Sequence, residues 1–327
     1  MRLATAIFCL MLTGAIGAAA GASTIRGFAP LASGASPHDA AVGRDGQVYF
    51  TEPAANRIGV LNPVSGQVKE FTVPTRDAFP GAITLGPGPW LSFTERRAGK
   101  IGQFLPATHV FREFPLPQRI DPDMPLAIGQ TVYFTARDAD AIGALDPGSG
   151  MTTMFAVPTA AAAPTGIVAG SDRALYFCET DAGSLGRFDL LTHRFLEYPI
   201  PSTGAQPRRL TAAGNRLYFT EYRAGRLAAF DLATKHFREW DLPGGRAARP
   251  GGIAVDRAGM VWLAERTGLV NFDPVTGRFQ TLAFPWSLPD DRSAADPITI
   301  GSHALAENGD LWIALPGARR LAVVIAR

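Results

Sequence analysis

The sequence has few charged residues, almost no cysteine and no excess of charge of one sign. Charged residues make up 18% of the 327 residues, and 31 basic side chains nearly balance 29 acidic ones. This balance argues against a nucleic-acid-binding protein, because such proteins concentrate basic residues on one face. The 46% hydrophobic content excludes a disordered chain. The 35 glycines and 26 prolines, spread along the whole length, favour many short strands joined by tight turns.

Only the start of the chain forms a long uncharged apolar run. Met1 and Arg2 precede an uncharged stretch over 3–17, and small residues follow at 18–22. A basic start, an apolar segment and small residues before a cleavage site are typical of a secretory signal peptide. We therefore predict that residues 1–22 are removed and that the mature protein is periplasmic or secreted. A retained anchor helix is the alternative, although a membrane span needs about 20 apolar residues, and no later run approaches that length.

The two cysteines cannot pair in the exported protein. Cys9 lies in the predicted signal peptide, and Cys178 is then alone, so we interpret Cys178 as a small core residue. A protein without disulfides needs a large hydrophobic core, which about 305 residues can supply. We expect residues 23–327 to form one domain and a monomer.

The strongest signal is a repeat of about 43 residues. In the first unit, short apolar segments at 40–42, 48–51, 57–61 and 68–73 are separated by turn-forming residues. The residue that follows the Phe-Thr of the second segment, or its equivalent, recurs as Glu52, Glu95, Ala136, Glu179, Glu221, Glu265 and Leu315. Four short antiparallel strands repeated seven times predict an all-β protein, a seven-bladed β-propeller with four-stranded antiparallel blades.

The last unit stops before its fourth strand. Residues 24–30 match the fourth-strand pattern of 68–74. We therefore predict that an N-terminal strand closes the last blade, which removes an exposed sheet edge. A six-bladed ring with an appendage and a β-helix are the alternatives.

Three stretches of the repeat carry a family resemblance. They read VYFTEPAANRIGVLNP, LSFTERRAGKIG and LYFTEYRAG, and they resemble the streptogramin B (virginiamycin B) lyase family of seven-bladed propellers over nearly the whole mature chain. The resemblance implies that a cyclic depsipeptide is opened at its ester by elimination, a carbon–oxygen lyase reaction. A histidine would remove a proton next to a carbonyl, and a magnesium ion would stabilise the developing negative charge.

The family's functional positions are only partly matched. The histidine that the family places after the opening proline of the sixth blade corresponds to Gly251. The family has another histidine at the opening of the seventh blade, and only His303 can match it, if two residues are deleted after His303. The later glutamate of the family corresponds to Pro316. Magnesium is thus implied by the resemblance alone, and no metal-binding cluster is recognisable in the sequence.

Two histidines are the candidate catalytic residues. His38 opens the first unit, and closure of the ring would bring it beside the seventh blade, which carries His303. Both would then approach the mouth, our name for the end of the channel where first strands begin and second strands end. Two imidazoles near Glu52 could supply a general base or metal ligands. Two hydrogen-bonded structural histidines are the alternative.

Glutamates and arginines are candidate ligand contacts at the same mouth. The repeated glutamates Glu52, Glu95, Glu179, Glu221 and Glu265 could line it, or they could accept hydrogen bonds within the scaffold. The arginines of the blade-to-blade loops and a nearby tyrosine could bind a carboxylate or phosphate, or the arginines could be solvated. These candidates are Arg208, Arg209, Arg246, Arg249 and Tyr222. The long stretch 286–301 beside the mouth could form a lid or an ordinary loop.

Three functions stay open at this stage. The first is an exported lyase-like propeller that acts on or binds a small molecule, with His303 or His38 as the base. The second is a non-catalytic propeller that binds a ligand or a protein at its mouth. The third is a metal-dependent hydrolase of the lactonase type.

Overall fold

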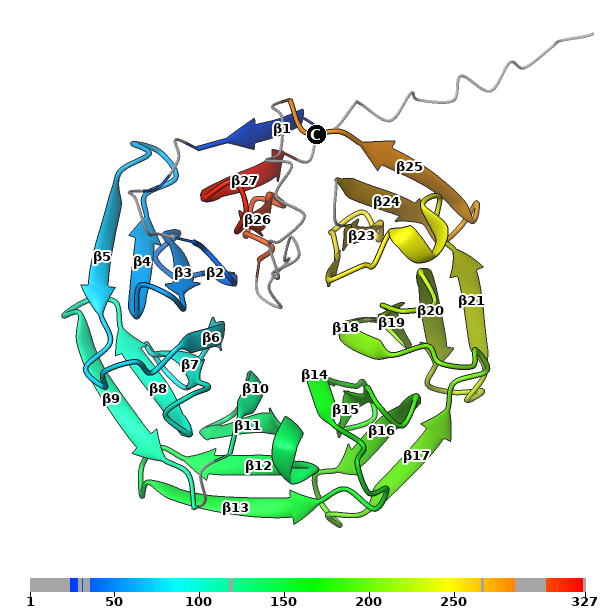
Figure 1. Cartoon of the computed structure of the whole chain (residues 1–327), viewed down its shortest axis with the longest axis horizontal. Helices are drawn as coiled ribbons and strands as arrows, with labels where there is room; N and C mark the ends of the chain where they lie inside the picture. Colours follow the sequence, from blue (N-terminus) through cyan, green and yellow to red (C-terminus); the bar gives the residue numbers. More distant parts are fainter. Residues whose placement is uncertain are drawn as a thin grey trace, which may run out of the picture.

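The computed structural model describes residues 24–28, 31, 36–117, 120–265, 268–285 and 304–325. Its strands form seven antiparallel sheets arranged in a ring around a central axis (Figure 1). The predicted seven-bladed β-propeller is therefore confirmed. The described helices are two single 3-10 turns, η1 (Arg137–Ala139) and η2 (Gly245–Ala247). Among the described residues, no helix has the length and apolar character needed to cross a membrane.

In blades 1 to 6 the four strands follow one another in sequence from the axis to the rim. The strands of the first three blades are β2 (Ala40–Val42), β3 (Val48–Glu52), β4 (Arg57–Leu61) and β5 (Val68–Thr72); β6 (Pro80–Leu85), β7 (Leu91–Glu95), β8 (Lys100–Leu105) and β9 (Val110–Pro115); and β10 (Pro122–Ile128), β11 (Thr131–Ala136), β12 (Ala141–Asp146) and β13 (Met151–Ala156). The strands of the next three are β14 (Pro164–Ala169), β15 (Ala174–Glu179), β16 (Ser184–Asp189) and β17 (Phe195–Pro199); β18 (Pro207–Ala213), β19 (Arg216–Glu221), β20 (Arg226–Asp231) and β21 (Phe237–Asp241); and β22 (Gly252–Val255), β23 (Val261–Ala264), β24 (Leu269–Asp273) and β25 (Arg278–Leu282).

Blade 7 is built from both ends of the chain, as the sequence predicts. Its sheet has the order β1 (Thr24–Gly27), β27 (Arg320–Ile325) and β26 (Leu311–Leu315). Strand β1 runs antiparallel to β27, from Thr24 opposite Ile325 to Gly27 opposite Ala322. This pairing gives the rim edge of β27 a partner.

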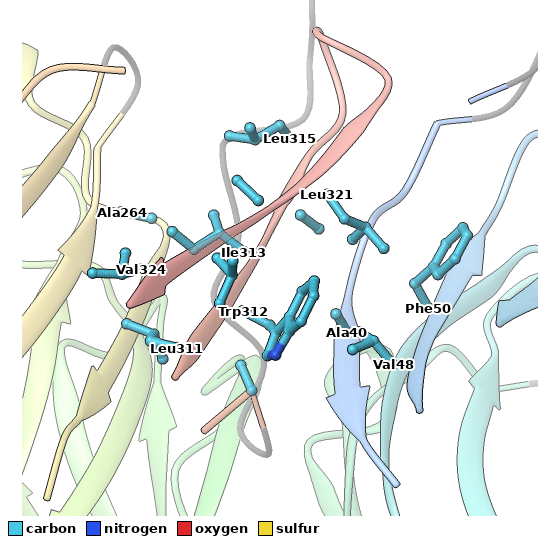
Figure 2. Packing of buried hydrophobic residues seen from close by; sticks show 14 of the residues in the cluster. Ala40, Val48, Phe50, Ala264, Leu311, Trp312, Ile313, Leu315, Leu321 and Val324 are labelled. Carbon is cyan, nitrogen blue, oxygen red and sulfur yellow. The ribbon is translucent and has the colours of Figure 1, made fainter. Parts of the chain in front are cut away.

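Apolar side chains seal blade 7 against its neighbours. Figure 2 shows Trp312 and Ile313 between Ala264 of blade 6 and Ala40 of blade 1. The ring of Phe28, just after β1, stacks on Trp312 with the ring centroids 5.1 Å apart. The N-terminal strand thus contributes packing as well as backbone hydrogen bonds to the closure.

The repeat's phenylalanine and glycine are one packing unit. In blade 2, Phe93 of β7 lies opposite Gly102 of β8, and a β-carbon on Gly102 would collide with the Phe93 ring. The same pairing recurs in blades 1, 3 and 4, as Phe50 with Gly59, Phe134 with Gly143 and Phe177 with Gly186. In these four blades the glycine leaves room for the aromatic ring, which lies across the third strand.

We expect loss of β1 to destabilise the whole ring. A chain that begins at Leu31 lacks β1 and Phe28, which leaves β27 with an unpaired edge and Trp312 without its stacked ring. Its melting temperature should fall and its tendency to associate should rise, as measured by calorimetry and size-exclusion chromatography. A chain that begins at Ser23 is the matched control. Equal melting temperatures for the two chains would contradict this role of β1.

We expect Gly102→Ala to lower the free energy of unfolding by about 1–3 kcal/mol in urea denaturation, because the new methyl group overpacks the core. The double variant Gly102→Ala/Phe93→Leu should recover part of this loss, because the smaller side chain leaves room. Gly148→Ala, in an exposed turn with only a flexible aspartate nearby, is the control and should have little effect. A Gly102→Ala variant as stable as Gly148→Ala would refute the packing argument.

Candidate functional site

In four blades the first strand does not enter the mouth as a regular strand. Next to their opening residues, the pairing with the second strand shifts register in four blades, between Pro80 and Ile83, Pro122 and Pro125, Thr165 and Ile167, and Pro207 and Leu210. Such β-bulges re-aim side chains and often lie next to functional sites. The displaced residues include Asp123 in blade 3 and the pair Arg208 and Arg209 in blade 5. The irregularity therefore places charged side chains at the mouth.

The threonine of the repeated Phe-Thr-Glu holds these openings. Its hydroxyl accepts a hydrogen bond from a first-strand N–H at 3.1–3.2 Å in four blades, from Asp39 to Thr51, Ala82 to Thr94, Met124 to Thr135 and Arg209 to Thr220. In blade 4 the buried Cys178 takes the place of this threonine, and Thr165 instead contacts the Thr180 hydroxyl at 2.6 Å. In blades 2, 3 and 5 the repeated threonine thus satisfies a donor that the bulge removes from the regular ladder.

An ion pair joins two blades that are not neighbours. Arg209 Nη1 lies 3.0 Å from Asp123 Oδ2, although blade 4 separates their blades in sequence. Burial acts to raise the pKa of Asp123, but the guanidiniums of Arg209 and Arg96 hold it below its ordinary value. A nearby acid, Asp39, is buried and accepts the Ile83 N–H at 3.0 Å; burial raises its pKa to about 6, and the Arg209 charge partly offsets this rise.

Two predicted ligand contacts are in direct contact with each other. The Arg208 guanidinium lies over the ring of Tyr222, 3.7 Å from its centroid. Arg208 is half-buried, whereas Arg246 and Arg249 are exposed. The structure therefore brings Arg208, Arg209 and Tyr222 together and leaves the other two arginines on the blade 5–6 connection.

Of the two candidate catalytic histidines, the structure describes His38. His38 is half-buried, and its N–H donates to the carbonyl of Thr51, so its backbone lies beside the residue that precedes Glu52. His303 lies outside the described residues, as do the stretch 286–301 and the predicted signal peptide. The pairing of the two imidazoles stays a prediction.

The repeated glutamates are buried between the blades. The exposed fraction is 0% for Glu52, Glu95, Glu179 and Glu221, and 7% for Glu265. A β-carbon on Gly186 would lie 2.7 Å from Glu179 Oε1, which shows that this side chain reaches over the third strand. This placement favours a structural role, and direct contact of these carboxyls with a substrate remains a prediction.

Each buried glutamate of blades 1, 2, 4 and 5 faces a second glutamate on the fourth strand. Burial, followed by the charge of Glu113, raises the pKa of Glu95 to about 8. In the same way, burial and the charge of Glu70 raise the pKa of Glu52 to about 7. Burial also raises the pKa values of Glu179 and Glu221 to about 8, with added effects from Glu197 and Glu239, respectively. Burial and the neighbouring fourth-strand charge therefore both favour the protonated form of the second-strand glutamate in these four blades.

The fourth-strand glutamates also tie each blade to the connection that precedes it. Glu113 accepts hydrogen bonds from the N–H and hydroxyl of Thr75, at 2.9 and 2.8 Å, and Glu197 accepts the same two from Thr159, at 3.0 and 2.8 Å. Glu239 accepts the N–H of Ser202 at 3.1 Å. The glutamate pairs are therefore part of the contacts between blades.

These fourth-strand glutamates were not among the predicted site residues, although the repeat carries the signal. The fourth-strand glutamate lies opposite the small residue of the third strand, as with Glu70 and Gly59. Blade 3 lacks both acids: Ala136 stands at the second-strand position, and Met154 lies opposite Gly143. The second-strand and fourth-strand positions are both acidic in blades 1, 2, 4 and 5 and both apolar in blade 3. This joint change indicates that the two side chains contact each other.

The described residues do not form a magnesium site. Among them, no group of three or more histidine, cysteine, aspartate or glutamate side chains could hold a metal ion. The opening of the sixth blade is Gly251-Gly252, which offers no side-chain donor. In the described part of the mouth, the family's cation therefore has no ligand set.

We expect Glu95→Gln to remove part of the pH dependence of stability. Since the pKa of Glu95 is raised from 4.5 to about 8, the folded chain holds more protons than the unfolded chain between these values. Stability therefore falls as pH rises through this window and levels off above pH 8. Glu95→Gln should be about as stable as the unmodified protein at pH 5 and more stable by about 2 kcal/mol at pH 9, the scale of a buried polar group left unsatisfied.

Urea denaturation at both pH values measures this difference. The exposed Glu307→Gln is the control and should show no pH-dependent gain. A Glu95→Gln variant that loses stability equally at pH 5 and pH 9 would show that the carboxyl is ionised in the folded chain.

The chain is similar in structure to solved streptogramin lyases. It superposes on a streptogramin B lyase with a TM-score of 0.81 and 28% identity, covering 93% of this chain and 98% of the other. It matches a selenomethionine-substituted virginiamycin B lyase from Staphylococcus aureus with a TM-score of 0.82 and 21% identity, covering 93% and 99%. A catalytically inactive variant of the latter, solved with quinupristin, gives a TM-score of 0.80 at 21% identity, covering 93% and 99%.

Comparison of the sequences supports the same assignment. No curated protein matches the chain. The profile of the Virginiamycin B lyase family, however, matches residues 5–272, which is most of the chain and includes blades 1 to 5 and most of blade 6. The protein belongs to the virginiamycin B lyase family.

Proposed function

We propose that the protein is exported and binds a small molecule at its mouth, where it opens an ester ring by elimination. The observation that carries the proposal is the set of bulged first strands that direct Asp123, Arg208 and Arg209 to one end of the channel. Membership of the family supports ester elimination as the reaction, and the quinupristin seen with the catalytically inactive lyase from Staphylococcus aureus supports a cyclic peptide as the ligand.

The reaction needs a base and a leaving group. His303, or else His38, would take the proton next to the carbonyl, the electron pair would form a carbon–carbon double bond, and the carbon–oxygen bond of the ester would break. The ester oxygen then leaves as a carboxylate. Atoms balance without water, so the product is a ring-opened isomer of the substrate.

A non-catalytic binding propeller is the second candidate. The observation that favours it is Gly251-Gly252 at the opening of blade 6, where the resemblance expects a histidine. A divalent cation remains part of the lyase proposal only through the family. Magnesium, calcium and manganese titrations followed by thermal unfolding test it, since a cation that binds the folded chain raises the melting temperature.

We expect slow conversion of a streptogramin B to a ring-opened isomer of unchanged mass, measured by mass spectrometry. His303→Ala should reduce the rate by about 100-fold or more if this imidazole is the base, and the same loss in His38→Ala would assign the base to blade 1. His236→Ala, in an exposed hairpin turn, is the control. A gain of one water in mass would indicate a hydrolase instead, and an unchanged streptogramin would leave the binding propeller as the function.

A further inference from the structure

The arginines near the mouth differ in whether a carboxylate neutralises them. Arg96 binds Asp121 with two hydrogen bonds of 2.8 and 2.6 Å, and Arg209 binds Asp123. Arg97, which with Arg96 lines a hollow of about 410 Å³, binds Asp77 at 2.8 Å. These three guanidiniums are held by acids of the protein.

Arg208 and Arg137 are not held in this way, because Asp123, the acid that interacts electrostatically with both, binds Arg209. Within the described part of the chain, neither side chain makes an ion pair or a hydrogen bond. Arg208 lies on the Tyr222 ring, half-buried, and its pKa is lowered by burial and then by the positive charges of Arg137 and Arg209. Arg137 begins η1, directly after the second strand of blade 3. The positive charges of Arg137 and Arg209 thus act against the charge of Arg208, and Asp123, which is bound to Arg209, offsets them only in part.

The backbone of Arg208 is fixed although its side chain has no polar partner. Its carbonyl accepts a hydrogen bond from the Thr165 hydroxyl at 3.1 Å. Gly166, with a φ of +47°, passes so close that a β-carbon there would lie 2.5 Å from the Arg208 carbonyl oxygen. A half-buried cation held in place beside like charges costs free energy unless an anion joins it. This arrangement is typical of a binding site and not of a solvated loop.

We propose that Arg208 and Arg137 bind the oxyanion group of a small-molecule ligand, a carboxylate, beside the ring of Tyr222. Guanidinium groups present paired N–H donors that match the two oxygens of a carboxylate. The proposal rests on the proposed function in one respect, that a small molecule enters the mouth. It adds the class of group that is recognised there. Ester elimination releases a carboxylate, so the same two arginines would receive the leaving group.

Benzoate and benzamide are matched probes for this site, because they differ in charge and share the ring. We expect benzoate to shift the arginine side-chain NMR signals of the full mature protein in a saturable way, with a dissociation constant on the order of millimolar. Benzamide should cause no such shift. Arg208→Gln and Arg137→Gln should each weaken benzoate binding by about tenfold, whereas the exposed Arg194→Gln, on the opposite face, should not.

Inorganic phosphate is the probe that distinguishes a phosphorylated ligand from a carboxylate ligand. Tighter binding of phosphate than of benzoate, with the same loss in Arg208→Gln, would assign a phosphorylated ligand and overturn the carboxylate. Equal binding of benzoate by the unmodified protein and by Arg208→Gln would overturn the site itself.

Thermal unfolding separates a binding role from a structural one. Arg208→Gln should change the melting temperature little, since the like-charge repulsion that it removes offsets the lost stacking on Tyr222. Arg209→Gln should lower it, because Asp123 would be left buried without its partner. A fall in Arg208→Gln as large as that in Arg209→Gln would contradict the proposal. Benzoate binding does not depend on turnover, so this site and the lyase activity can fail independently.

Discussion

Antiparallel pairing of the two chain ends is the interaction on which the rest of the structure depends. A propeller blade exposes an unpaired edge unless the ring closes, and here β1 supplies the rim strand of the sheet formed by β26 and β27. The stacked rings of Phe28 and Trp312 add apolar packing at the same seam. Only a closed ring keeps the openings of the first strands facing one another, so the mouth and its charges follow from this pairing.

Within the closed ring, residues that recur from blade to blade and residues that occur in single blades have separate roles. The repeated phenylalanine, glycine and glutamate are buried parts of the scaffold, and the repeated threonine satisfies buried N–H donors. The exceptions are charged groups at the openings of single blades, such as Asp123 and Arg209, whereas blade 2 has Gly81 and Ala82 at the same two positions. A site built on a symmetric scaffold arises where the repeat is broken, because only there does one blade differ chemically from the next.

The fold could be predicted from the sequence because its determinants are local and occur several times. Turn residues between four apolar segments predict one blade, and the fourth-strand pattern of residues 24–30 predicts the closure. The site depends on contacts between distant blades. Nothing in the sequence near Arg209 indicates that its partner is Asp123, 86 residues earlier, because that contact depends on how far the bulges turn two side chains toward the axis. Arg137 was missed for the same reason, since its relation to Arg208 appears only when blades 3 and 5 are placed in space.

The ion pair between Asp123 and Arg209 also affects how the ring can move. It fastens blade 3 to blade 5 at the hub, so blade 4 is a segment held at both flanks. Three successive blades are then joined by a charge contact across the hub in addition to the packing between neighbouring blades. A ligand that competes for either charge would have to replace this contact, so binding at the hub would act on blades 3 and 5 together.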